Sequence, residues 1–151
     1  MSDDLSIELR HQADYRFELD FDHGRSPIVV TDLGPPLGAG AGPDPEKLLA
    51  SAIATCLSSS LLFALKKFGN AAPPIRARAT PALVRNEQKR LRVGHVDVEL
   101  DLGVPAASLK SLERALATFE DFCVVTQSVR AAIPVNVRIV DGDGAVLASP
   151  A

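Results

Sequence analysis

The chain has 151 residues, of which 46% are hydrophobic, and it carries a formal net charge of −3. This length fits one domain spanning residues 1–151. The acidic balance and the lack of any Lys/Arg run exclude the basic surface that nucleic acids and anionic lipids attract. We therefore expect no nucleic acid and no membrane among its partners.

The N-terminus and the cysteine count bear on the compartment. The segment MSDDLSIELR is acidic and has no positively charged start followed by an apolar run, so it is unlike a secretory signal. We expect a cytoplasmic protein. Two cysteines, Cys56 and Cys123, are too few for a disulfide scaffold. In a reducing compartment such a pair is more often buried, metal-bound or redox-active than permanently cross-linked.

The first third of the chain has the pattern of an antiparallel meander. Between residues 15 and 22 aromatic and aliphatic side chains alternate with charged ones, which is the period of a half-buried strand. The run from Leu5 to Arg10 is expected to pair with it, and PIVVTDL predicts a third strand after the turn DHGRS. Residues 33–45 hold four glycines and four prolines and predict a loop.

Residues 45–68 predict a long central helix. Asp44 is a favourable N-cap, Pro45 suits the first helical position, and Gly69 suits the end. Residues 48–65 contain no charged side chain, which approaches the length that crosses a bilayer. Serines and a threonine dilute this segment, however, and the amphipathic strands on both sides need an apolar partner. We therefore interpret the helix as enclosed in the core.

The second half of the chain predicts a hairpin, a second helix and a closing strand. Residues 75–86 and 91–104 form two strands, of which the second alternates apolar and charged side chains and so has one wet face. From Pro105 onward apolar residues recur at spacings of three and four, which places Cys123 on the apolar stripe of a helix. Residues 133–141, IPVNVRIVD, predict the last strand.

The sequence does not support nucleotide binding, serine hydrolase activity or zinc binding. The glycines in GAGAGP give GxGxG with Pro43 where a third glycine belongs, and an acidic helix start would repel phosphate. The serines of residues 58–60 lack a nucleophile elbow. The three histidines have no paired spacing that would hold zinc. We expect no cofactor and no metal.

Each cysteine taken alone is most simply a packed core residue, because free cysteine behaves as a small hydrophobe. A reactive role requires a thiolate, and the thiolate requires a nearby cation. The uncharged helix around Cys56 supplies none, so a cation must come from another part of the chain or from another subunit.

Two segments resemble the signature regions of the OsmC/Ohr family, which comprises osmotically inducible protein C and the organic hydroperoxide resistance proteins. They are DPEKLLASAIATC, with Glu46 ten residues before Cys56, and FCVVTQSVRAAIPVNVRI, with Cys123 sixty-seven residues after Cys56. The order of elements is also similar. The resemblance implies an α+β fold in which antiparallel sheets pack on a long cysteine-bearing helix and a second helix, as an intertwined homodimer.

The resemblance also implies thiol-dependent reduction of small organic hydroperoxides. Carried over to this sequence, Cys56 would be the peroxidatic cysteine, Cys123 the resolving cysteine, and Glu46 the carboxylate that orients an activating arginine. An external thiol or dithiol would regenerate the pair. The candidates for the arginine all lie in the N-terminal meander, at Arg10, Arg16 and Arg25.

The spacing of Glu46 and Cys56 adds a constraint. Ten helical residues separate them by about 15 Å along the axis, so a shared site needs a partner subunit or a long arginine between them. The family motif often reads C-P-x-S/T, whereas Val124 follows Cys123 here and Thr126 keeps the last position. The alternative function is a non-catalytic OsmC-fold protein that binds a small apolar ligand at its dimer groove, with both cysteines merely packed.

Overall fold

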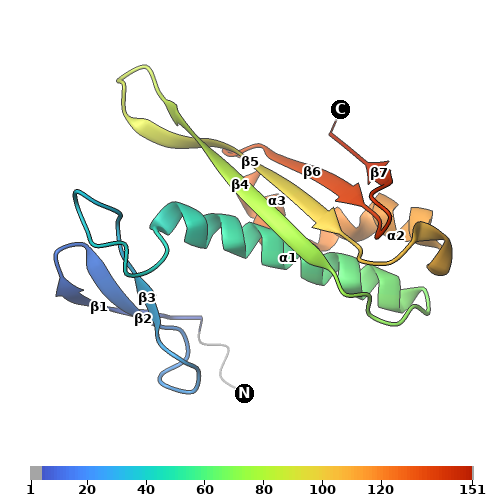
Figure 1. Cartoon of the computed structure of the whole chain (residues 1–151), viewed down its shortest axis with the longest axis horizontal. Helices are drawn as coiled ribbons and strands as arrows, with labels where there is room; N and C mark the ends of the chain where they lie inside the picture. The colour runs from blue at the N-terminus through green and yellow to red at the C-terminus, as the bar shows by residue number, and fades with distance from the viewer. Residues whose placement is uncertain (1–4, 151) are drawn as a thin grey trace. The chain divides into compact units, whose positions relative to one another are not determined.

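The computed structural model describes residues 5–150. It consists of two compact units, one ending at Leu48 and one beginning at Leu49 (Figure 1). The boundary lies near the start of helix α1 (Pro45–Lys67), which therefore contributes its first turn to the N-terminal unit. The expectation of one domain over the whole chain stays a prediction.

The N-terminal unit is the predicted antiparallel meander. Its strands β1 (Glu8–Ala13), β2 (Arg16–Asp20) and β3 (Val29–Thr31) lie in the order β1-β2-β3. β1 begins later than expected and runs almost up to β2, because Asp14 adopts a positive φ of 45° and closes a tight turn. Leu19 in β2 is buried as the alternation predicts, but Asp20 is buried as well, and Tyr15 and Phe21 on either side of the strand are 47% and 45% exposed.

The Gly- and Pro-rich segment after β3 is a loop, as predicted, and Asp32 orders it. Asp32 Oδ2 accepts hydrogen bonds from the backbone N–H groups of Ala39 at 3.1 Å and Ala41 at 3.0 Å. These bonds, led by that from Ala41, hold the pKa of the carboxyl below its usual value despite desolvation. Gly42 packs against the backbone carbonyl of Val30, where a Cβ would collide, so this close approach requires glycine.

Helix α1 begins and ends within one residue of the predicted bounds. Asp44 Oδ1 accepts a hydrogen bond from Lys47 N at 2.9 Å, which is the expected N-cap. At the other end Gly69 has a φ of 81°, and the N–H groups of Gly69 and Asn70 donate to carbonyls of the last turn. This is a Schellman motif, and it stops the helix where the glycine predicts.

The expectation that α1 is enclosed all round is wrong for one chain. Its buried residues form one face: Ala50, Ile53, Ala54, Leu57, Leu61, Ala64 and Leu65. Phe63, by contrast, is 64% exposed, because the core contributed by a single chain covers only one side of the helix. Within residues 5–150, α1 is the one helix long and apolar enough to cross a membrane, a property it shares with core helices of soluble proteins.

The second unit contains a four-stranded sheet in the order β4-β5-β6-β7. Its strands are β4 (Arg76–Arg85), β5 (Leu91–Asp101), β6 (Val135–Val140) and β7 (Val146–Ala148). The hairpin and the strand at 135–140 are confirmed. The sheet is not antiparallel throughout, since the helical segments between β5 and β6 return the chain so that β6 pairs parallel to β5. The three-residue strand β7 was not predicted.

The predicted second helix is a broken series of short segments. These are η1 (Ala106–Ser108), α2 (Leu112–Thr118), η2 (Phe119–Phe122) and α3 (Val124–Val129), where η marks a 3₁₀ turn. Cys123 has extended backbone, with φ −80° and ψ 95°, and separates η2 from α3. The prediction of one continuous helix through Cys123 is therefore wrong, because apolar spacing reports which side chains are buried but not whether the backbone between them is helical.

The core of the second unit lies between the sheet and the helices, which cover one face of it (Figure 1). The buried strand residues of this core are Val96, Val98, Leu100, Val135 and Ile139. The opposite face is polar, as predicted for one wet face. There Arg76 pairs with Asp101 at 3.1 Å and Asn136 donates to Asp97 at 2.8 Å.

Candidate active site

The fold brings the two cysteines together from distant parts of the sequence. Cys56 lies in the middle of α1 and is half-buried, whereas Cys123 lies at the start of α3 and has no exposed surface. Both are free thiols in the same apolar core, and the Cys56 side chain lies near enough to Cys123 to influence the pKa of its thiol. Packing of the second helical region against α1 therefore creates a dithiol within one unit.

The environment of Cys123 favours the protonated thiol. Burial raises the pKa of Cys123, and the hydrogen bond with Cys56 raises it further, while Thr126 acts in the opposite direction. Cys123 Sγ donates a hydrogen bond to Thr126 Oγ1 at 2.9 Å, and Thr126 is fully buried as well. Cys123 is thus the sheltered member of the pair and Cys56 the accessible one.

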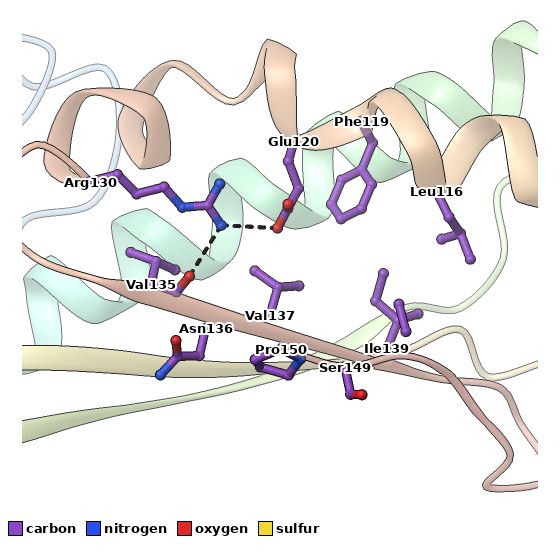
Figure 2. A pocket seen from close by; sticks show the side chains of 11 residues that line it. Leu116, Phe119, Glu120, Arg130, Val135, Asn136, Val137, Ile139, Ser149 and Pro150 are labelled. Carbon is purple, nitrogen blue, oxygen red and sulfur yellow. Dashed lines mark hydrogen bonds and ion pairs between the residues drawn. The ribbon is translucent and has the colours of Figure 1, made fainter.

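The turn that carries Cys123 is held by bonds that do not involve sulfur. Gln127 N donates to the Cys123 carbonyl at 2.9 Å, and Gln127 Nε2 donates to the Glu120 carbonyl at 2.9 Å. Arg130 pairs with the Glu120 carboxylate at 3.1 Å and also donates to the Val135 carbonyl (Figure 2). The position of the Cys123 backbone therefore does not depend on the state of its thiol.

A cavity of about 340 Å³ lies beside this turn, between the helical segments and β6 (Figure 2). Its walls include the side chains of Leu116, Phe119, Glu120, Arg130, Val137 and Ile139. Neither cysteine lines it, so the cavity is distinct from the dithiol. This cavity was not predicted from the sequence, because Glu120 and Arg130 belong to different elements and no motif joins them.

Glu46 does not belong to the same compact unit as the cysteines. It lies in the first turn of α1, within the N-terminal unit, while Cys56 and Cys123 lie in the second unit. Its assignment as an orienting carboxylate stays a prediction.

The three candidate arginines differ in how they are engaged inside the N-terminal unit. Arg10 lies 3.5 Å from Glu8 and 3.9 Å from Glu18. Arg25 Nε donates to the backbone carbonyl of Asp22 at 3.0 Å. The charge of Arg16 contributes to the lowered pKa of Asp32, but no hydrogen bond or ion pair of Arg16 occurs within the described part of the unit. Among the three candidates, Arg16 is therefore the one whose guanidinium has the fewest hydrogen-bond and ion-pair partners in the described part of this unit.

His11 and His95 each contact an oxygen of a residue close to them in the chain. His11 Nε2 lies 2.9 Å from the Asp14 carbonyl, and His95 Nε2 lies 3.4 Å from the Asp97 carboxylate. Across residues 5–150 no group of three or more His, Cys, Asp or Glu side chains is arranged to hold a metal ion.

Solved structures share this fold at low sequence identity. An OsmC-like protein from Mycoplasma pneumoniae aligns with a TM-score of 0.74 at 12% identity, covering 93% of this chain and 99% of that one. An OsmC-like protein of unknown function from Vibrio cholerae aligns with a TM-score of 0.71 at 17% identity, covering 91% and 99%. The organic hydroperoxide resistance protein OhrB of Bacillus subtilis aligns with a TM-score of 0.64 at 17% identity, covering 89% and 96%.

The sequence itself matches a family model. No curated protein matches the chain. The model of OsmC-like proteins, however, matches residues 38–138, a span that contains Glu46, both cysteines and the elements that position them. Since this match covers more than half of the sequence and the fold agrees with it, the chain belongs to the OsmC-like protein family.

Proposed function

We propose that this chain is a thiol-dependent peroxidase that reduces organic hydroperoxides through Cys56 and Cys123. Membership in the OsmC-like family, with structural neighbours named as organic hydroperoxide resistance proteins, supports a peroxidase role at the family level. The observation that carries the residue assignment is the meeting of two thiols of unequal exposure in the core of the second unit.

In the first step the Cys56 thiolate attacks one peroxide oxygen of the hydroperoxide. A sulfur–oxygen bond forms, the O–O bond breaks, and the alcohol leaves after taking up a proton. Cys56 is oxidised to a sulfenic acid and the hydroperoxide is reduced. Cys56 takes this role because it is half-buried, whereas Cys123 has no surface that a substrate can reach.

In the second step Cys123 resolves the sulfenic acid. Its sulfur attacks Cys56 Sγ, a disulfide forms, and the hydroxyl of the sulfenic acid leaves as water with the proton of Cys123. An external dithiol then reduces the disulfide to two thiols and is itself oxidised to a disulfide. The packing of both side chains in one core supports this step.

The first step needs a cation, because a thiolate in a partly apolar site is unstable without one. The arginines that the sequence offers for this role are Arg10, Arg16 and Arg25, and we propose that one of them supplies the cation. Glu46 orients it, either within the chain or across a dimer.

A homodimer is part of the proposal. Phe63 on α1 is 64% exposed, and Phe122 and Val124, which flank Cys123 in the chain, are 65% and 75% exposed. A single chain in water would leave these large apolar side chains uncovered. A second copy that covers them would also give the cysteines an apolar entrance suited to an organic hydroperoxide. The cytoplasmic location stays a prediction.

The test is a peroxidase assay with matched cysteine variants. The purified protein should consume cumene hydroperoxide in the presence of a dithiol faster than it consumes hydrogen peroxide, and Cys56→Ser should abolish turnover. Cys123→Ser should still react once, leaving a sulfenic acid on Cys56 that dimedone traps. Equal background rates for the wild type and Cys56→Ser would contradict the proposal. They would favour the alternative function, a non-catalytic binder of small apolar ligands.

A further inference from the structure

The hydroxyl of Thr126 has an unusual partner for a helical threonine. Ser and Thr side chains in helices commonly bond to the carbonyl four residues earlier. Two nearby residues make this hydrogen bond: Ser128 Oγ donates to the Val124 carbonyl at 2.7 Å, and Thr118 Oγ1 donates to the Arg114 carbonyl at 3.1 Å. Thr126 Oγ1 instead accepts a hydrogen bond from the Cys123 thiol at 2.9 Å, where neither residue is exposed.

A hydroxyl can form a hydrogen bond with a cysteine sulfur in either protonation state. It accepts from S–H when the sulfur is protonated and, after rotation, donates to the thiolate when the proton is gone. A buried charge without such a donor is strongly disfavoured. Thr126 therefore offers Cys123 a hydroxyl donor, in addition to its own backbone N–H, that stabilises an anion inside the core.

We propose that Thr126 is a positioning residue of the resolving step, whose hydroxyl holds Cys123 Sγ in place and stabilises its thiolate as it attacks the Cys56 sulfenic acid. This role rests on the proposed peroxidase function. The oxidant is an organic hydroperoxide, which has already oxidised Cys56. In the assisted step the Cys123 thiolate forms the S–S bond, and the sulfenic hydroxyl leaves and takes up the proton that Cys123 released.

The charges around Cys123 agree with this role. Burial and the Cys56 thiol raise the pKa of Cys123, and Thr126 lowers it. Of the charged residues nearest in the chain, Asp121 on η2 is exposed, and Glu120 on η2 pairs with Arg130, which follows α3, at 3.1 Å. Thr126 is therefore the side chain that offsets the cost of forming the Cys123 thiolate.

The experiment is a single turnover with one equivalent of cumene hydroperoxide over a range of pH. Thr126→Val removes the hydroxyl at nearly constant volume, Thr126→Ser keeps it, and Ser128→Ala removes a hydroxyl of the same helix that bonds only to backbone. Dimedone quenching follows the sulfenic acid of Cys56, and mass spectrometry follows the Cys56–Cys123 disulfide.

We expect Thr126→Val to form the sulfenic acid as fast as the wild type, which also shows that it is folded. Disulfide formation should slow about tenfold at neutral pH, and its pH midpoint should rise by about one unit, as expected for losing a hydrogen bond to a charged group. Thr126→Ser and Ser128→Ala should retain the wild-type midpoint.

Two results would overturn the role of Thr126 while leaving the peroxidase intact. One is a wild-type rate and midpoint in Thr126→Val. The other is equal slowing of Thr126→Val and Thr126→Ser without any change in midpoint, which indicates a packing effect only. A wild-type protein that forms no Cys56–Cys123 disulfide would instead contradict the two-cysteine function itself.

Discussion

Replacing Phe63 tests whether a second copy covers the exposed face of α1. Phe63 is 64% exposed in the single chain. With about 200 Å² for a phenylalanine side chain, about 130 Å² would be buried in a dimer. At about 25 cal/mol per Å² this burial contributes about 3 kcal/mol per subunit. A two-fold interface contains the residue twice, so Phe63→Ala should weaken dimerisation by about 6 kcal/mol, roughly four orders of magnitude in Kd.

Sedimentation velocity over a dilution series measures this change directly. The wild type should remain a dimer at concentrations where Phe63→Ala is a monomer. Val146→Ala is the matched control, because Val146 is also half exposed, at 51%, but lies on the short edge strand β7 rather than on α1. If Phe63→Ala and the wild type dissociate at the same concentration, Phe63 is not part of the interface. A wild type that is a stable monomer at micromolar concentration would refute the homodimer.

Two further predictions concern the carboxylates that fix loops and helix ends. Asp44→Ala removes the acceptor for Lys47 N, and we expect urea unfolding to show a loss of about 1 kcal/mol; an unchanged midpoint would mean that the cap is redundant. The Asp141 carboxylate accepts hydrogen bonds from the backbone N–H groups of Ala106, Ala145 and Asp143. These bonds hold the pKa of Asp141 below its usual value. The stabilisation of the folded state by Asp141 is therefore present above about pH 4 and is lost as the pH falls through the folded-state pKa. Asp141→Asn should therefore be less stable at pH 7 and lose less stability than the wild type between pH 5 and pH 3, whereas parallel pH profiles would contradict this.

Local rules account for the parts of the fold that the sequence predicted well. The ends of α1 follow from Asp44 and Gly69, whose capping bonds involve residues at most a few positions away. The strand β5 follows from alternation, because Val96, Val98 and Leu100 pack in the core while the residues between them are charged. The parallel pairing of β5 with β6 depends instead on how the intervening helical segments turn the chain, which no local pattern encodes.

The site was predicted less completely than the fold. Resemblance and spacing singled out Cys56 and Cys123, and the packing of the helical region against α1 brings them together. The break in the backbone at Cys123 was missed, because the apolar spacing continues through it. The motif position kept by Thr126 pointed to this residue, but spacing alone did not predict that its hydroxyl bonds to the Cys123 sulfur.

The unequal burial of the two sulfurs also determines how the proposed cycle returns to its start. An external dithiol can attack only the accessible sulfur of the disulfide, which is that of half-buried Cys56. Cys123 then becomes the leaving group, and a thiol of raised pKa is a poor one because leaving groups of low pKa depart faster. The Thr126 hydroxyl accepts from the Cys123 thiol and, after rotation, can donate to the departing thiolate, which offsets this disadvantage. The same hydrogen bond therefore assists Cys123 twice in each turnover, once when it attacks Cys56 and once when it is released, so loss of the hydroxyl should slow reduction of the disulfide as well as its formation.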